Sequence, residues 1–199
     1  MLNLFQHPFF EFHLEKNLYN LHNLKVIFMN YFSQQSPRLL YRKLTEADIP
    51  SWTEFFINND RVRFLGFDKT KSADISATEW IHKQMERNTV GGFGQLAVIE
   101  KETGELIGVG GIIVRELKSK TEYEITYSLK PAFWGKGYGT EIAMHFKSFG
   151  LDNKISDHFI SIIHKENEPS MHVARKNGMD MLYETEFLEM PVFVFGDKK

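Results

Sequence analysis

Hydrophobic and polar residues follow a regular pattern from Arg38 onward, and this pattern predicts strands and helices in mixed order. Strands are predicted at 39–42, 95–100, 106–115, 123–129 and 157–163, with one or two more within 181–195. Helices are predicted to begin near 45–48 and to span 72–88, 140–149 and 168–177, the last stopped by Gly178. The turn at 102–104 joins two of the three central strands, so that an antiparallel meander is expected. Pro191 is expected at a turn, a bulge or a sheet edge because it lacks an N–H group.

Residues 1–36 differ from the rest of the chain: they are rich in Phe, Asn, His and Leu and contain no Gly. Leu14, Leu18 and Leu21 recur at helical spacing, which predicts a short amphipathic helix whose apolar stripe would favour a homodimer. The alternative is that Met29 is the biological start and that the preceding residues are an over-long gene start. We therefore divide the chain into an N-terminal extension, 1–36, and a single domain, 37–195.

Composition excludes several classes of protein. The chain has 199 residues, of which 42% are hydrophobic, enough for one domain with a real core. A net charge of −2 leaves no basic field for nucleic acid, and no stretch approaches the ~20 apolar residues of a membrane span. The chain has no cysteine, and its eight histidines show no metal-ligand spacing, so no metal site is expected. A cytoplasmic protein is predicted, without contact to nucleic acid or membrane.

The run most suggestive of chemistry is a predicted strand that leads into three alternate glycines, Gly135, Gly137 and Gly139, and then into a helix. Glycines leave their backbone N–H groups accessible, and the N-terminus of the helix adds the positive end of its dipole. Lys136 adds a full positive charge. This arrangement suits a pyrophosphate. The P-loop pattern GxxxxGK[ST] is absent, and Thr140 stands where the dinucleotide pattern GxGxxG needs its third glycine. A glycine-rich turn that binds nothing is the structural alternative.

These residues resemble the GNAT superfamily of acyl-CoA-dependent N-acetyltransferases, in particular the branch of the ribosomal-protein N-terminal acetyltransferases. The family carries [Q/R]-x-x-G-x-[G/A] at its pyrophosphate loop. This chain has Trp-Gly-Lys-Gly-Tyr-Gly at 134–139, with Trp in the first position, as is common in that branch. Glu-Ile-x-Tyr at 124–127, and Asn-x-x-Ser at 167–170 followed by Lys-x-Gly at 176–178, match two further segments. The resemblance covers roughly residues 37–190.

The resemblance implies a mixed, mostly antiparallel central sheet flanked by helices, whose fourth and fifth strands splay apart to admit the pantetheine arm of acetyl-CoA. Backbone groups of the strand at 127–129 would pair with that arm, an instance of strand addition. The implied acetyl-CoA-binding residues are Tyr127, Ser128, Leu129, Trp134, Gly135, Lys136, Gly137, Tyr138, Gly139, Thr140 and Asn167.

Catalytic roles are also implied. Glu124 would act as a general base, directly or through a water, and Ser170 would stabilise or protonate the leaving thiolate. Tyr127 and Tyr183 are further candidate acids. For each residue a structural role remains open: Glu124 could be a carboxylate on a sheet face paired with Lys or Arg, Ser170 a helix-start hydroxyl, Asn167 a helix cap, and Trp134 and Tyr138 anchors of the loop.

The predicted reaction is acetyl transfer from acetyl-CoA to a primary amine, which is either a protein N-terminus or a small molecule. The acceptor must lose a proton before it attacks, and an α-amine, with a pKa near 8, needs less help than a lysine side chain, near 10.4. The alternative is a protein of the same fold that binds acyl-CoA without turnover, as a sensor or an assembly partner.

Overall fold

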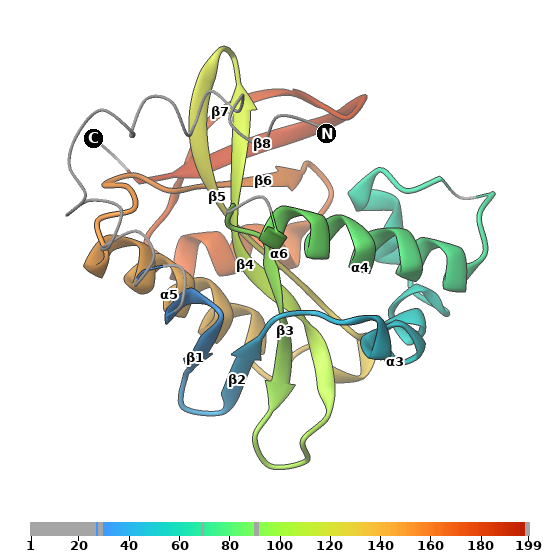
Figure 1. The fold of residues 1–199 in the computed structure, drawn as a ribbon. Helices are drawn as coiled ribbons and strands as arrows, with labels where there is room; N and C mark the ends of the chain where they lie inside the picture. The colour runs from blue at the N-terminus through green and yellow to red at the C-terminus, as the bar shows by residue number, and fades with distance from the viewer. Residues whose placement is uncertain (1–26, 28–29, 69, 90–91, 198–199) are drawn as a thin grey trace, which may run out of the picture.

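The computed structural model describes residue 27 and residues 30–68, 70–89 and 92–197. The leucine stripe predicted at 14–21, and with it the basis for a homodimer, lies outside the described residues. The described residues form one sheet of eight strands in the order β1-β2-β3-β4-β5-β6-β8-β7 (Figure 1). Its strands are β1 (Ser33–Gln35), β2 (Leu39–Arg42), β3 (Gln95–Glu100), β4 (Leu106–Leu117), β5 (Lys120–Leu129), β6 (Ile160–His164), β7 (Asp180–Phe187) and β8 (Met190–Gly196).

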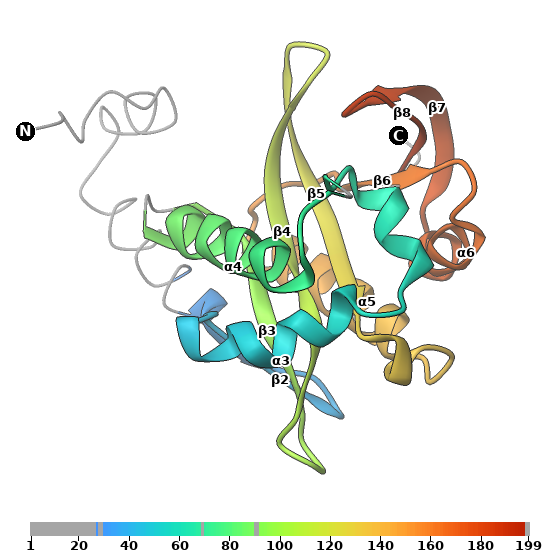
Figure 2. The same ribbon diagram turned by 90° about the vertical axis from the view of Figure 1, so that its right-hand side faces the viewer.

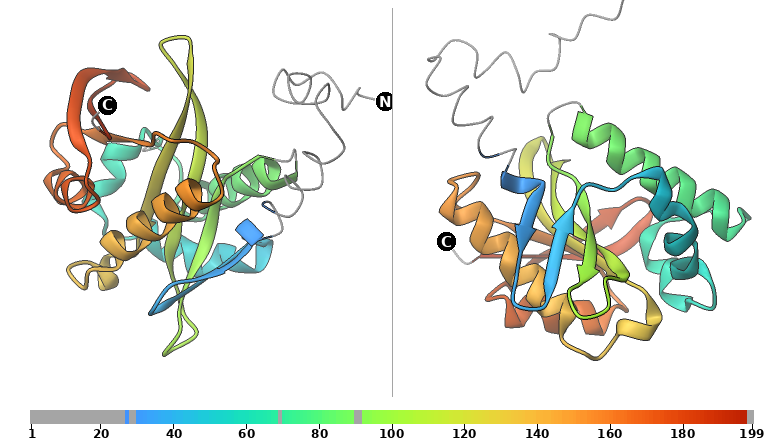
Figure 3. Two further views of the ribbon diagram at one scale, coloured as in Figure 1. Left: turned by 90° about the vertical axis from the view of Figure 1, so that its left-hand side faces the viewer. Right: turned by 60° about the horizontal axis from the view of Figure 1, so that its bottom comes forward.

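Neighbouring strands are antiparallel except for β5 and β6, which run parallel. The fold class predicted by the resemblance, a mixed and mostly antiparallel sheet flanked by helices, is thus confirmed. The helices are η1 (Glu46–Asp48), α3 (Ile49–Thr53), η2 (Glu54–Phe56), η3 (Asp60–Leu65), α4 (Ala73–Thr89), η4 (Pro131–Phe133), α5 (Tyr138–Asp152) and α6 (Glu168–Lys176). Helices α3 and α4 lie on one face of the sheet and α5 and α6 on the other (Figures 2 and 3).

Strand β3 shows how the sequence builds these two layers. Its side chains alternate between the faces, and all six of its residues are buried. Leu96 and Val98 join the core under α5 and α6, whereas Ala97 and Ile99 join the core under α3 and α4. A strand covered on both faces has little polar alternation, which explains why residues 96–99 read as a continuous apolar run.

The described fold includes residues before the predicted boundary at residue 37. Strand β1 pairs with β2, and the side chain of Tyr31 is fully buried. The Tyr31 hydroxyl accepts a hydrogen bond from the Ile112 N–H (2.8 Å) and donates one to the Gly94 carbonyl (2.5 Å). A three-residue polar strand shows no hydrophobic alternation, so the pattern gave no sign of it. Because β1 adds a strand in front, the implied fourth and fifth strands are β5 and β6.

The position of Pro191 differs from the expectation. It is the second residue of β8, which lies inside the sheet between β6 and β7. The strand tolerates it because it directly follows the β7–β8 turn, in which Leu188 and Glu189 both have positive φ (51° and 59°). Its carbonyl still takes part in hydrogen bonding and accepts from the Lys165 N–H (3.1 Å).

Removal of the Phe146 side chain should destabilise the fold strongly. Phe146 on α5 is fully buried in the core between that helix and the sheet. Phe146→Ala should lower the free energy of unfolding by about 3–5 kcal/mol, because buried Phe→Ala changes lose transfer energy and leave a cavity. Urea unfolding followed by circular dichroism measures this value. Met144→Ala, on the same helix but 50% exposed, is the matched control, and equal losses in both variants would contradict the described packing.

Candidate active site

The glycine loop lies at the N-terminus of α5. Gly135 and Gly137 have left-handed φ angles of 75° and 81°, a conformation that side chains disfavour. Gly137 is the N-cap of α5, and the first bond along the helix runs from the Glu141 N–H to the Gly137 carbonyl (3.1 Å). The N–H groups of residues 138–140 therefore have no acceptor within the helix. Together with the helix dipole they form a site suited to an anion.

Position 139 requires a glycine for a steric reason and not for its φ angle. A Cβ atom at this position would lie 2.9 Å from Cε2 of Tyr127, closer than real contacts allow. The start of α5 therefore packs directly on the Tyr127 ring of β5. This contact fixes the distance between the loop and the strand beside it.

Aromatic residues hold the loop in place. Trp134 donates from its indole N–H to the Leu129 carbonyl (2.8 Å) and lies under the guanidinium of Arg61, whose Cζ is 3.8 Å from the ring centroid. Tyr138 is buried and hydrogen-bonds Glu100. The structural role left open for these two residues, as anchors of the loop, is thus observed.

Arg38 and Glu141 brace the loop, and neither was among the predicted site residues. Arg38 donates to Glu141 from Nε (2.7 Å) and from its backbone N–H (2.9 Å), and its Nη1 donates to the Lys136 carbonyl (3.0 Å). Its Nη2 lies 3.6 Å from the place a Cβ of Gly137 would take. The side chain of Lys136 is exposed and lies over Phe133 (4.8 Å). Arg38 lies in the turn between β1 and β2, almost 100 residues before the loop, so no local motif could reveal it.

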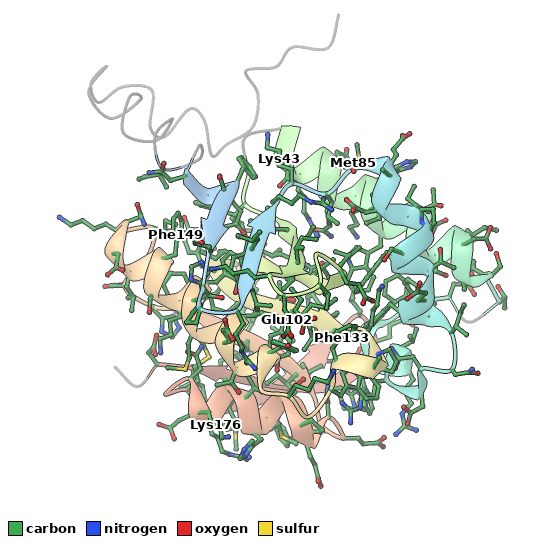
Figure 4. All side chains as sticks on the ribbon, turned by 90° about the horizontal axis from the view of Figure 1, so that it is seen from below. Lys43, Met85, Glu102, Phe133, Phe149 and Lys176 are labelled. Carbon is green, nitrogen blue, oxygen red and sulfur yellow. The ribbon has the colours of Figure 1, made fainter. Side chains whose placement is uncertain are left out.

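Strands β5 and β6 part after a single pair. Their register contains only Glu124 opposite Ile160, and beyond this point the two strands diverge. A cavity of about 370 Å³ lies between the end of β5, the start of α6 and the glycine loop. Its lining includes Tyr127, Ser128, Leu129, Trp134, Gly135, Gly137, Tyr138, Gly139, Thr140, Asn167, Ser170 and Lys176. The implied splay is present, and of the predicted cofactor residues only Lys136 does not line this cavity. Figure 4, a view from below, labels two side chains of this lining, Phe133 on η4 and Lys176 on α6.

Backbone direction corrects one expectation along β5. The Lys130 N–H donates to the carbonyl of Ile107 in β4 (2.9 Å), whereas the Leu129 carbonyl accepts from the Trp134 indole N–H. Because backbone groups alternate in direction along a strand, Tyr127 and Leu129 face the gap and Ser128 faces β4. The backbone of Ser128 is therefore not placed to pair with a ligand in the gap. Its side chain still lines the cavity.

A second cavity, of about 400 Å³, adjoins the first. Tyr127, Ser128, Asn167 and Ser170 line both. The outer part of the second cavity is lined by α4, by β5 and by the turn between β7 and β8. The two cavities thus meet at the point where β5 and α6 approach each other.

Glu124 lines the second cavity rather than the first. It is 5% exposed, and its Oε2 accepts from Arg115 Nε of β4 (2.7 Å). The structural alternative for Glu124, a sheet carboxylate paired with an arginine, is thus present. The same carboxylate borders the cavity, so this pairing leaves the catalytic prediction open to test.

The predicted hydroxyl and amide groups meet at the shared wall. Asn167 is the N-cap of α6 and accepts from the Ser170 N–H (3.3 Å), so the cap is Asn167 and not the Ser170 hydroxyl. Burial raises the pKa of Tyr127 to about 12, which the neighbouring Ser170 hydroxyl and the charge of Arg61 partly oppose. No hydrogen bond of ordinary geometry satisfies the buried Tyr127 hydroxyl within the described residues. Tyr183, in contrast, lies under Lys118 (4.0 Å) and lines neither cavity, which excludes it as the acid of this site.

Metal ligands and membrane spans were also sought among the described residues. In that part of the chain no three or more His, Asp or Glu side chains lie together in a group that could hold a metal ion. None of its helices is both long and apolar enough to cross a bilayer.

Comparison with known proteins agrees with this geometry. The sequence model of the acetyltransferase (GNAT) domain matches residues 38–180, and the chain therefore belongs to the GNAT acetyltransferase family. The uncharacterized protein YkkB of Bacillus subtilis is 27% identical over 120 residues, which cover 60% of this chain and 70% of YkkB.

Solved structures of ribosomal-protein acetyltransferases share the fold. The S5-alanine acetyltransferase of Vibrio fischeri superposes with a TM-score of 0.65 at 14% identity, covering 83% of this chain and 95% of that one. RimL, the ribosomal L7/L12 α-N-protein acetyltransferase, was solved in complex with coenzyme A. It superposes with a TM-score of 0.64 at 16% identity, covering 81% and 94%. The branch suggested by the sequence resemblance is thus found among proteins of the same fold.

The Glu141 carboxylate should stabilise the fold at neutral pH, and this stabilisation should disappear in acid. Burial alone would raise the pKa of Glu141, but hydrogen bonds from Ser36 and Arg38 outweigh burial and hold this pKa below its usual value. A lowered pKa stabilises the folded state above the unfolded pKa of about 4.3, and this stabilisation is lost as the pH falls through the folded pKa. Glu141→Gln should therefore cost on the order of 1 kcal/mol at pH 7 and progressively less below pH 4. Urea midpoints from pH 3 to 7 measure it, and a pH-independent difference would contradict the assignment.

Proposed function

We propose that this protein transfers an acetyl group from acetyl-CoA to a primary amine. The observation that carries the proposal is the junction of two cavities at Tyr127, Ser128, Asn167 and Ser170. One cavity leads from this junction to an anion site at a helix N-terminus, and the other leads outward along β5. Two substrates could enter from opposite sides and meet at the shared wall.

The residues of the first cavity fit acetyl-CoA. Free N–H groups at 138–140 suit its pyrophosphate, and Gly135 and Gly137 leave room for close approach. The gap beside Tyr127 and Leu129 offers backbone groups to the amides of its pantetheine arm. When bound, acetyl-CoA supplies an activated thioester carbonyl. The family and the coenzyme A complex of RimL support this choice of cosubstrate.

We expect Glu124 to receive the proton of the amine. Its carboxylate borders the outer cavity, and Arg115 fixes one of its oxygens. An amine must be uncharged to attack, and at neutral pH a lysine side chain is almost fully protonated, whereas an α-amine is partly free. A base here therefore matters most for strongly basic acceptors.

Tyr127 is better suited to donate a hydrogen bond than a proton. With a pKa of about 12 it remains protonated at neutral pH, and its hydroxyl lies at the shared wall. A thiol has a pKa near 8.5, so full proton transfer from this tyrosine to a leaving thiolate would be uphill by roughly 5 kcal/mol. A hydrogen bond from Tyr127, aided by the adjacent Ser170 hydroxyl, could stabilise the developing negative charge without that transfer.

Filling the glycine loop should abolish cofactor binding. Gly137→Glu places a negative side chain in the anion site and adds the strain of a left-handed φ, at about 1–2 kcal/mol. Calorimetric titration should show micromolar affinity for acetyl-CoA and CoA in the unaltered protein, little affinity for ATP or NAD, and at least a ~10-fold loss in the variant.

Gly104→Glu is the matched control, because Gly104 also has a positive φ (72°) but lies in the exposed β3–β4 turn. Acetyl-CoA binding equally weakened in both variants, or absent in the unaltered folded protein, would refute the proposed site. Binding without acetylation of any amine would indicate a sensor instead.

Loss of the Glu124 carboxylate should lower turnover and leave cofactor binding intact. Glu124→Gln should reduce kcat at pH 7 by about 100-fold, a usual contribution of a general base, with KM for acetyl-CoA unchanged. The deficit should shrink at higher pH, where more of the amine is already free. Glu116→Gln, an exposed carboxylate on the neighbouring strand β4, is the control. Unchanged turnover in Glu124→Gln at neutral pH would assign Glu124 a structural role only.

A further inference from the structure

Charged residues are concentrated along the second cavity. They are Glu79, Lys83, Arg87, Arg115 and Glu124. His164 also lines it, and its Nδ1 accepts a hydrogen bond from the Glu166 N–H (3.1 Å).

Both carboxylates of this set already have cationic partners. Glu79 pairs with Lys71 (2.6 Å), which points away from the cavity lining, and Glu124 pairs with Arg115 (2.7 Å). What remains is a positive excess carried by Arg87 and Lys83. Neither has a carboxylate within ion-pair distance among the described residues.

Arg87 is the more informative of the two because it is partly buried. It lies near the end of α4, and its Nη1 donates to Gln84 Oε1 (3.1 Å). Burial lowers the pKa of Arg87, the nearby positive charge of Arg115 lowers it further, and Glu124 and Glu86 oppose the shift. Arg87 and Arg115 therefore line one partly desolvated cavity, and Glu124, which is already paired with Arg115, only partly offsets the charge of Arg87.

Apolar walls complete the cavity. Trp80, Phe64, Phe67 and Phe187 line it beside the charged groups. Phe187 also lies 5.2 Å from the Arg115 guanidinium and helps to hold it in place. Such a cavity excludes water around the arginines and so strengthens their attraction for a carboxylate.

We propose, on the basis of the acetyl transfer proposed above, that the acceptor is a primary amine that also carries a carboxylate, bound by Arg87 with Arg115 beside it. Glu124 and Tyr127, at the junction of the cavities, are three residues apart on β5, roughly 10 Å along the strand. The amine would lie between them and pass its proton to Glu124 directly or through a water, while the carboxylate would lie beyond Glu124, at the arginines. The acceptor should thus hold its amine and its carboxylate several bonds apart. An acidic peptide N-terminus and a linear amino acid both satisfy this chemistry. Polyamines, which are wholly cationic, do not.

Matched acids and amides test the proposal. The acceptors are linear amino acids from glycine to 6-aminohexanoate, each with its amide, and the amidated dipeptides Ala-Asp and Ala-Asn, with spermidine as the cationic comparison. The measured quantity is the ratio of kcat/KM for acid over amide. In Arg87→Gln this ratio should fall about 10- to 100-fold, the usual worth of a charge-assisted hydrogen bond, with KM for acetyl-CoA unchanged.

Each acid and its amide differ in the basicity of the amine, but this difference is the same for every variant. It therefore cancels when the acid-to-amide ratio of kcat/KM is compared between variants. Arg175→Gln is the control, because Arg175 is exposed on α6 and lines neither cavity. Its ratio should equal that of the unaltered protein. A preference in the linear series identifies a small amino acid as the source of the carboxylate, and a preference only in the dipeptides identifies a protein N-terminus.

Several results would overturn the proposal. They are an unchanged ratio in folded Arg87→Gln, equal use of acids and amides by the unaltered protein, or spermidine as the best acceptor. Acetylation of amides or polyamines alone would leave acetyl transfer standing and remove only this acceptor class.

A binding measurement on the unaltered protein tests the carboxylate site even if the Arg87→Gln variant fails to fold or no acetylation is detected. Quenching of tryptophan fluorescence in the unaltered protein, where Trp80 lines the cavity, should report 6-aminohexanoate but not its amide. No difference between the two titrations would also reject the carboxylate site.

Discussion

The parting of β5 from β6 after one parallel pair is the constraint on which the rest of the site depends. A sheet edge normally presents unpaired backbone groups to solvent, but here the opening lies inside the sheet, between strands held together at Glu124 and Ile160. The gap therefore combines backbone polarity with apolar walls. Both cavities derive from it, because residues of both parting strands line the second cavity, and the first continues from the end of β5 to the glycine loop.

The two layers of helices give this opening its ends. Helix α5 starts at the glycine loop, and its packing on β5 through Gly139 and Tyr127 sets the inner end. Helix α4, on the opposite face, supplies Arg87 and Trp80 to the outer end. The same layering that buries the core under each face thus puts the proposed anion site on one side and the proposed acceptor site on the other.

Local patterns predicted most of this fold. The meander at 95–129, the glycine loop and the two following helices were all readable, because each follows from a periodic run or a turn residue close in sequence. Strand β1 and Tyr31 were missed, since a three-residue polar strand owes its existence to pairing with β2 and not to its own pattern. The predicted strand at 157–163 begins later, at Ile160, because Ser156 and His158 form a turn in which Ser156 Oγ bonds the His158 backbone (2.6 and 3.1 Å).

The site divides in the same way. Residues within the motifs at 127–140 and 167–170 lie together as expected, whereas Arg38, Arg87 and Arg115 reach the site from other elements and carry no local signal. Ser128 shows the limit of a motif match: residue identity placed it at the gap, but strand alternation turned its backbone toward β4. Long-range arrangement and backbone direction are properties of the assembled sheet.

The contact between Gly139 and the Tyr127 ring has a consequence for sequence divergence. A methyl group at position 139 requires the ring at 127 to move or shrink, and the ring hydroxyl lies where the two cavities join. The two positions should therefore covary among homologues: small residues at 139 with tyrosine at 127, larger ones with a smaller side chain there. A change in the glycine loop would in this way be transmitted to the junction of the two cavities during evolution, although the two are separated in sequence by a strand end and a turn.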